Sequence, residues 1–131
     1  MHNRREFLGT LTLASGLFSL LKSVPAQAKK LAIPLSKAEK LKIVGASEVL
    51  EVKNLTVLFV RDSETTIRAL DPICTHKKCT VAYNKAEKRV ECPCHGSAYG
   101  LDGKVLKGPA TQPLKVYEAA LSGDRIVLTI E

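Results

Sequence analysis

All four cysteines and two of the three histidines of this chain lie in two short segments, residues 74–79 and 92–97. The first segment reads C-T-H-K-K-C and the second reads C-P-C-H-G-S, so they contain a Cys-x-His pair and a Cys-x-x-His pair. Two thiolates and two imidazoles can hold a 2Fe-2S cluster, with the cysteines on one iron and the histidines on the other. We therefore predict one such cluster, which transfers single electrons. The predicted ligands are Cys74, His76, Cys92 and His95.

Cys79 and Cys94 remain once these ligands are chosen, and they are free to pair with each other. Two alternatives use the same residues. A zinc site also takes two cysteines and two histidines, but it leaves the other two cysteines unexplained. A structural pair of disulfides uses all four cysteines, but it makes both histidines accidental. The iron–sulfur cluster is the interpretation we favour.

Residues 1–28 have the order of an export signal. A pair of arginines at positions 4 and 5 precedes an apolar run, and a small-residue cleavage site ends at Ala28. The run is about 15 residues long, whereas a membrane span needs about 20. Twin arginines are typical of the Tat route, which carries folded proteins and would suit a cluster assembled before export. We expect a periplasmic protein, or one on the outer face of the cytoplasmic membrane, with the signal cleaved or retained as an anchor.

The composition allows one small globular domain and argues against a nucleic-acid partner. The 131 residues are 45% hydrophobic and carry a formal net charge of +7. Such basicity is compatible with nucleic-acid binding. However, the sequence has only three Tyr and three Phe, no Trp, and no recognisable recognition helix. A basic surface that faces an acidic redox partner is the better interpretation.

The pattern of apolar residues predicts an all-β domain over residues 41–131. Residues 29–40 contain Pro34 and four lysines, so we expect a linker or an extended lead-in there. Short runs with β-branched residues or alternating polarity predict strands, and Gly123-Asp124 predicts a hairpin turn. Two ligand segments joined by a hairpin would lie side by side in loops. The predicted strands are residues 41–44, 49–52, 55–61, 66–70, 81–83, 88–91, 114–118 and 125–130.

The two segments resemble the cluster-binding boxes of Rieske iron–sulfur proteins, and the resemblance runs from about residue 41 to residue 131. It is strongest to the kind that serves quinol-oxidising cytochrome bc and bf complexes. Ring-hydroxylating dioxygenases share the ligand spacing but lack the additional cysteines. The resemblance implies an antiparallel β-sandwich of small stacked sheets, with a subdomain of loops that binds the cluster.

The resemblance also assigns roles to individual residues. It implies that Cys74 and Cys92 bind one iron, that His76 and His95 bind the other, and that Cys79 and Cys94 form a disulfide. Ser97 and Tyr99 match residues that donate hydrogen bonds to sulfur. The run Gly108, Pro109 and Ala110 matches a loop that covers the cluster.

These assignments predict a cluster of high potential. Two neutral imidazoles leave less negative charge on the centre than two further thiolates would, and hydrogen bonds to sulfur disperse the added electron. Clusters with mixed ligands span roughly −150 to +300 mV, and we expect the upper part of that range. Ferric iron should also acidify the outer N–H groups of the histidines, so that reduction is linked to protonation.

Three residues depart from the pattern that the resemblance implies. Lys77 and Lys78 stand where quinol-oxidising members usually have Leu-Gly, and Gly100 stands where an acidic or amide residue commonly follows the tyrosine. The sequence therefore predicts an electron-transfer subunit of a quinol-oxidising complex or of a periplasmic oxidoreductase. Its partners would be a cytochrome b or c, or a molybdopterin subunit, with quinol as a further candidate. The alternative is a soluble periplasmic carrier or redox-sensing module outside any fixed complex.

Overall fold

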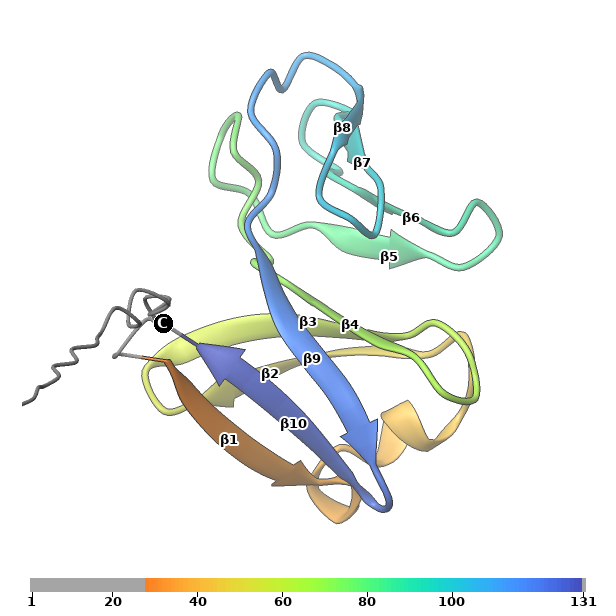
Figure 1. Ribbon diagram of the computed structural model, residues 1–131. Helices are drawn as coiled ribbons and strands as arrows, with labels where there is room; N and C mark the ends of the chain where they lie inside the picture. The colour runs from red at the N-terminus through yellow and green to blue at the C-terminus, as the bar shows by residue number, and fades with distance from the viewer. Residues whose placement is uncertain (1–27, 131) are drawn as a thin grey trace, which may run out of the picture.

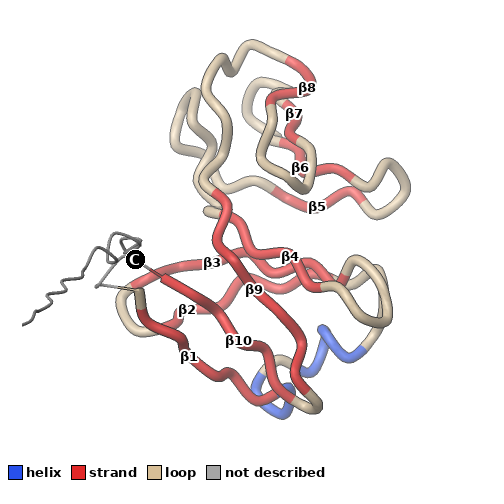
Figure 2. The backbone as a smooth tube through the Cα atoms, viewed as in Figure 1, coloured by secondary structure: helices blue, strands red, loops and turns tan. Residues whose placement is uncertain are grey.

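Ten strands and two short 3₁₀ helices follow one another along residues 28–130, the part of the chain that this computed structural model describes (Figures 1 and 2). The elements are β1 (Lys29–Pro34), η1 (Leu35–Lys37), η2 (Glu39–Lys42), β2 (Ser47–Val52), β3 (Leu55–Arg61), β4 (Ile67–Leu70), β5 (Ala82–Asn84), β6 (Arg89–Glu91), β7 (Ala98–Tyr99), β8 (Val105–Lys107), β9 (Val116–Ser122) and β10 (Arg125–Ile130). The all-β prediction is confirmed. In this part of the chain no helix is long and apolar enough to cross a membrane.

The strands form two antiparallel sheets. Six strands make the larger sheet in the order β1-β10-β9-β4-β3-β2, and four make the smaller one in the order β5-β6-β7-β8. The chain leaves the larger sheet after β4, builds the smaller sheet, and returns as β9 (Figure 1). Residues 71–115 are therefore an excursion between two neighbouring strands of the larger sheet. Figure 1 shows the smaller sheet and its loops standing over one side of the larger sheet.

Strand β3 lies between two hydrophobic cores, and side chains on both of its faces are buried. Val57 and Phe59 belong to the core of the larger sheet, whereas Leu58 and Val60 belong to a second core beneath the smaller sheet. A strand covered on both faces has a continuous apolar run instead of alternating polarity. This is why residues 57–60 are the most hydrophobic stretch of the described chain.

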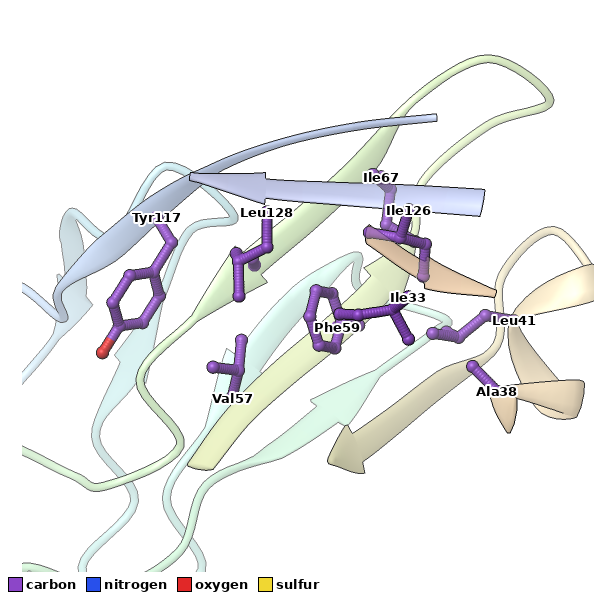
Figure 3. Packing of buried hydrophobic residues seen from close by; sticks show 10 residues of the cluster. Ile33, Ala38, Leu41, Val57, Phe59, Ile67, Tyr117, Ile126 and Leu128 are labelled. Atoms are coloured by element: carbon purple, nitrogen blue, oxygen red, sulfur yellow. The ribbon is translucent and has the colours of Figure 1, made fainter. Parts of the chain in front are cut away.

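The first core fills the curled larger sheet, as Figure 3 shows for its labelled residues. The ring of Phe59 lies near its centre and is fully buried. The members of this core are Ile33, Ala38, Leu41, Val57, Phe59, Ile67, Ala69, Tyr117, Ile126 and Leu128. The second core packs residues of the larger sheet against the smaller sheet and its loops. Its members are Leu58, Val60, Leu70, Cys74, Val81, Val90, Cys92, Tyr99, Ala110 and Leu114.

Residues 29–34 are extended and the 3₁₀ helices η1 and η2 follow them, and Ile33 and Ala38 of this segment are buried in the first core, so it packs with the domain and is not a linker before it. Lys29–Pro34 forms β1, which pairs along its whole length with β10, and the Ile33 side chain is buried. β1 is an edge strand, where lysines and proline are commonly found because they discourage further strand pairing. The lysines that suggested a linker are thus typical of an edge. The domain accordingly begins near residue 29, before the predicted residue 41.

The strand predicted over residues 41–44 is absent. Glu39–Lys42 is the 3₁₀ helix η2, in which Leu41 is fully buried, while Ile43 and Val44 are exposed. The apolar run was misread because one buried leucine and two exposed β-branched residues look like a short strand. The predicted strands 49–52, 55–61, 66–70, 81–83, 88–91, 114–118 and 125–130 match β2 to β6, β9 and β10 to within a few residues. The predicted signal, apart from Ala28, lies outside the described residues.

Candidate functional site

Both cysteine- and histidine-containing segments are closed loops of the same hydrogen-bond pattern. In residues 74–79 the first residue donates its N–H to the sixth (Cys74 N to Cys79 O, 2.7 Å), and the fifth donates back to the first (Lys78 N to Cys74 O, 3.0 Å). In residues 92–97 the corresponding bonds are Cys92 N to Ser97 O, 2.8 Å, and Gly96 N to Cys92 O, 3.0 Å. Each loop is therefore held as a rigid unit by its own backbone.

The hairpin of β5 and β6 places these two loops next to each other, as the sequence predicted. A disulfide between Cys79 and Cys94 links them, with their Cα atoms 6.4 Å apart. The predicted pairing is confirmed. Two antiparallel strands at one end and a covalent bond at the other fix the separation of the loops.

The remaining chemistry-bearing side chains gather between the loops. The rings of His76 and His95 lie edge to face, with centroids 5.1 Å apart, and both residues are exposed. Cys74 and Cys92 are unpaired thiols, each about 1% exposed. The site thus has two sulfurs on its protein side and two imidazoles on its solvent side.

A second group of sulfurs lies close together, but it is not an alternative metal site. The Sγ atoms of Cys79, Cys92 and Cys94 lie within 4.8 Å of one another. Two of them are joined in the disulfide and carry no thiolate. Since a metal ligand must be a thiolate, only Cys92 of this group is available to a metal.

Tyr99 is fully buried on β7 and its hydroxyl points at the first loop. The oxygen lies 3.3 Å from Cys74 Sγ and 2.9 Å from Thr75 Oγ1. Burial raises the pKa of the Cys74 thiol, while the Tyr99 hydroxyl lowers it as a hydrogen-bond donor. Backbone N–H groups of His76 and Lys77 lower it as well, and together they bring the pKa of Cys74 below its ordinary value. The pocket therefore favours the thiolate that a metal needs.

The same contacts act in the opposite direction on Tyr99. Burial of its ring raises the pKa of the hydroxyl, and the hydrogen bond to Cys74 raises it further. Tyr99 consequently keeps its proton. Because the Thr75 hydroxyl donates to Gln112, Tyr99 shares this one proton between Cys74 Sγ and Thr75 Oγ1. The resemblance assigned Tyr99 the role of a donor to sulfur, and the contact with Cys74 is consistent with it.

Ser97 is fully buried and its hydroxyl oxygen accepts the N–H of Ala110 at 3.0 Å. Ala110 ends the run Gly108-Pro109-Ala110, whose Gly108–Pro109 peptide is cis. The contact ties this run to the second loop. The Ser97 hydroxyl proton is not used by that bond, because the oxygen is the acceptor. It stays available for a sulfur acceptor.

Thr75 is the residue that sequence reasoning missed. Its hydroxyl donates to the carbonyl of Gln112 at 2.8 Å, so it ties the first loop to residues 107–113. Its backbone N–H also donates to the Tyr99 hydroxyl at 3.3 Å. The only signal in the sequence was the position of a threonine between two predicted ligands. Nothing in the sequence indicated that a carbonyl 37 residues away was its partner.

The donor set fits a 2Fe-2S cluster. Two buried thiols, one of them biased towards the thiolate, and two neighbouring imidazoles are the kinds of donor that a mixed cysteine–histidine centre requires. The fold and site together define an iron–sulfur electron-transfer protein with an all-β cluster domain. A model of the Rieske [2Fe-2S] domain family matches residues 32–118. The chain belongs to the Rieske family and has one Rieske 2Fe-2S cluster as its cofactor.

Curated relatives agree with this assignment. The chain is 31% identical over 139 residues to the cytochrome b6-f complex iron-sulfur subunit of Chlorobaculum thiosulfatiphilum, an alignment that covers 96% of this chain and 75% of that protein. It is 46% identical over 72 residues to the cytochrome b6-f complex iron-sulfur subunit of Nostoc punctiforme, covering 53% of this chain and 40% of that protein. The Nostoc relative is therefore matched over less than half of its length.

Solved structures share the fold. The plasma membrane Rieske protein PetC3 of Synechocystis PCC 6803 superimposes with a TM-score of 0.59 at 31% identity, covering 75% of this chain and 97% of that chain. A chain of a hyperthermophilic respiratory Complex III superimposes with a TM-score of 0.53 at 27% identity, covering 72% and 71%. The chain described here is thus a Rieske electron-transfer protein, homologous to the iron–sulfur subunits of cytochrome complexes.

Proposed function

We propose that Cys74 and Cys92 bind one iron of the cluster and that His76 and His95 bind the other iron. The observation that carries this assignment is the arrangement of two buried thiols and two exposed imidazoles on a pair of matching loops. Cys79 and Cys94 are excluded as ligands because their sulfurs are already bonded to each other. When bound, the cluster takes up and releases one electron at a time.

The protein around these ligands favours a high potential. The Tyr99 hydroxyl lies at hydrogen-bond distance from Cys74 Sγ, and the backbone N–H of His76 lies 3.4 Å from the same sulfur. Donors at a ligand sulfur stabilise the additional negative charge of the reduced form. We place the midpoint potential in the upper part of the range of roughly −150 to +300 mV for mixed-ligand clusters.

Electrons enter and leave through the histidine side of the site. His76 and His95 are exposed, whereas both ligand cysteines are buried against the second core. Three loops carry or cover the proposed ligands, and they lie at the end of the molecule remote from η1 and η2 (Figure 1). These loops are residues 74–79, 92–97 and 107–113. A partner that approaches this end comes within reach of the imidazoles without displacing any part of either core.

The physiological role that these features support is electron transfer in a quinol-oxidising cytochrome complex. The support is the similarity to proteins named as cytochrome b6-f complex iron-sulfur subunits. In this role the protein passes electrons from quinol to a cytochrome. A molybdopterin-containing periplasmic oxidoreductase is the second kind of complex that a Rieske subunit of this size would suit.

Residues 1–28 are proposed to export the protein by the Tat route to the periplasm or the outer face of the cytoplasmic membrane. This proposal rests on the arginine pair, the apolar run and the cleavage site of the sequence. Cell fractionation of a tagged protein tests it, with Arg4→Lys combined with Arg5→Lys as the variant. Retention of this variant in the cytoplasm is expected, and export of the variant at the normal level would contradict the Tat assignment.

The ligand assignment is tested by metal content and electron paramagnetic resonance of the dithionite-reduced protein. We expect two irons per chain and the low-average-g signal of a cysteine–histidine cluster. Cys74→Ser, Cys92→Ser, His76→Ala and His95→Ala should each abolish that signal. His2→Ala is the matched control, since His2 is the third histidine of the chain and lies in the predicted signal. Zinc without iron, or an unchanged signal in any ligand variant, would overturn the assignment.

A further inference from the structure

The surface around the exposed histidines is basic and contains no carboxylate. We define the loop tip as residues 74–79, 92–97 and 107–113, the two matching loops and the segment that covers them. These residues include three lysines and no Asp or Glu. The lysines are Lys77, Lys78 and Lys107, and all three are exposed. Among the described residues none of them forms an ion pair.

Lys77 and Lys78 are the charged residues adjacent in sequence to the proposed ligand His76. They follow His76 directly in the chain, and Cys79 of the disulfide comes next. The backbone N–H of Lys78 is fixed to the carbonyl of Cys74 at 3.0 Å. The two charged side chains therefore extend from a loop that is anchored on both sides. The fold therefore fixes the backbone from which these two exposed side chains extend.

The acidic residues that border the tip do not cancel this charge. Glu91 precedes the second loop, but its carboxylate is bound by Arg89 at 2.6 Å and by Asn84 at 3.1 Å. Asp71 accepts the backbone N–H of Ile73 at 3.0 Å, at the base of the first loop. Lys107 lies near enough to Glu91 to act on its carboxylate. Lys77 and Lys78 are thus the main uncompensated charges of the tip.

We infer that the loop tip is a docking surface for an electron-transfer protein whose surface is acidic around its own cofactor. Opposite charges around two redox centres steer the partners together and orient the exposed edges of the centres towards each other. The inference rests on the proposed function, because it places the exchange of electrons at the histidine side of the cluster. It adds the chemical character of the partner.

Docking by charge predicts that the rate of electron transfer depends on salt and on the charge of the partner, which the properties of the cluster alone do not predict. Charges at the surface are screened over about 10 Å at 0.1 M ionic strength. The rate of reaction with an acidic partner should therefore fall with added salt, and the rate with a basic partner should rise. Apolar docking at the same loops would leave both rates nearly independent of salt.

The experiment compares two double charge reversals in the full-length cluster-containing protein. Lys77→Glu combined with Lys78→Glu removes the proposed surface. Lys37→Glu combined with Lys40→Glu is the matched control, with the same change in net charge on η1 and η2, which Figure 1 shows at the end of the larger sheet remote from the tip. Iron content and the electron paramagnetic resonance signal are measured first in each protein, so that loss of the cluster is recognised separately.

Stopped-flow kinetics then follow oxidation of the reduced protein by ferricyanide, which accepts one electron to become ferrocyanide, and by tris(phenanthroline)cobalt(III), which accepts one electron to become the cobalt(II) complex. The same protocol is run with one c-type cytochrome of net negative charge and one of net positive charge. Relative to the control variant, the tip variant should react about tenfold more slowly with ferricyanide and with the negative cytochrome at low salt. It should react faster with the cationic complex and the positive cytochrome. These differences should shrink at high salt.

Equal effects of the two double variants, or rates with the negative cytochrome that do not depend on salt, would overturn the docking proposal. It would also be overturned if the tip variant lost binding to phosphatidylglycerol vesicles but reacted normally with both cytochromes, since the lysines would then serve a lipid surface. Lys77→Gln combined with Lys78→Gln gives the same comparison at half the charge change if the reversal impairs cluster binding. Absence of the cluster signal in the unmodified protein would instead reject the proposed function.

Discussion

The loops 74–79 and 92–97 share one backbone frame but use it for different chemistry. In both, the first residue is a buried cysteine, and the same two backbone hydrogen bonds close the turn. The fifth residue has a positive φ in both, 60° at Lys78 and 80° at Gly96. The histidine is the third residue of one loop and the fourth of the other. The frame therefore fixes the position of one sulfur ligand, while the positions of the imidazole and the disulfide cysteine vary.

The two loops also differ in how they hold residues 107–113. The first loop uses the Thr75 hydroxyl, which donates to the Gln112 carbonyl at an exposed site. The second loop uses the Ser97 hydroxyl, which accepts from the Ala110 N–H at a buried site. One segment is thus fastened to both loops by one hydroxyl each. The three loops are thus connected to one another, and the buried one of the two connections is on the second loop.

Breaking the covalent link between the loops should have the largest effect on stability. Cys79→Ser combined with Cys94→Ser removes the disulfide, which bridges residues 15 apart. A loop of that length corresponds to about 3 kcal/mol of unfolding free energy. Urea denaturation of the oxidised protein measures the loss. The matched control is the unmodified protein after selective reduction, which should lose a similar amount. A change below about 1 kcal/mol would mean that the hairpin of β5 and β6 alone holds the loops together.

The Ser97 hydroxyl of the second loop should contribute more to the free energy of unfolding than the Thr75 hydroxyl of the first loop. Ser97→Ala leaves the buried Ala110 N–H without a partner, and an unpaired buried donor costs about 1–3 kcal/mol. Thr75→Val removes the exposed contact with Gln112, where water replaces it, and the contact with the Tyr99 hydroxyl. Because that hydroxyl keeps Cys74 Sγ and the Thr75 N–H as partners, the variant should cost less than about 1 kcal/mol. Thermal unfolding of both variants gives the order. The opposite order would show that residues 107–113 are held mainly by the first loop.

The Tyr99 hydroxyl, which contacts the first loop, should raise the midpoint potential of the cluster as well as stabilise the fold. Tyr99→Phe removes the donor at 3.3 Å from Cys74 Sγ. The reduced form then loses about 1–2 kcal/mol of stabilisation, and the midpoint potential should fall by roughly 40–90 mV. Protein-film voltammetry measures the shift.

Tyr83→Phe is the matched control for this potential, because Tyr83 packs against the same core and, among the described residues, its hydroxyl forms no hydrogen bond to Cys74, unlike that of Tyr99. Equal midpoint potentials for Tyr99→Phe and the unmodified protein would mean that the Tyr99 hydroxyl does not affect the potential. A shift of similar size in Tyr83→Phe would trace the effect to the loss of any hydroxyl near the smaller sheet.

The sequence predicted the all-β fold class and most of the strands, whereas contacts between distant parts of the chain were missed. The cysteine and histidine spacing brought both loops to attention, and the resemblance to Rieske proteins predicted the disulfide that the structure has between them. Most strands were found from local patterns. The edge strand β1 was missed because its pairing with β10, almost a hundred residues later, leaves no local pattern. Thr75 was missed for the same reason, since its partner Gln112 is distant in the chain.

The smallest predicted change in stability tests whether the two loops have the same backbone conformation at their fifth residue. Lys78 has φ 60°, a conformation that costs a residue with a Cβ about 1 kcal/mol, whereas Gly96 at φ 80° carries no such cost. Lys78→Gly should therefore stabilise the protein by up to about 1 kcal/mol, reduced by the greater freedom of glycine in the unfolded chain. Gly96→Lys should destabilise it by about the same amount, because a Cβ at Gly96 meets no atom within 4 Å and only the backbone strain counts. Chemical denaturation of both variants and of their combination gives the three free energies. Opposite and roughly additive changes would support an equivalent frame in both loops. A loss of stability in Lys78→Gly would show that the lysine side chain makes a stabilising contribution to the first loop that outweighs its strained backbone.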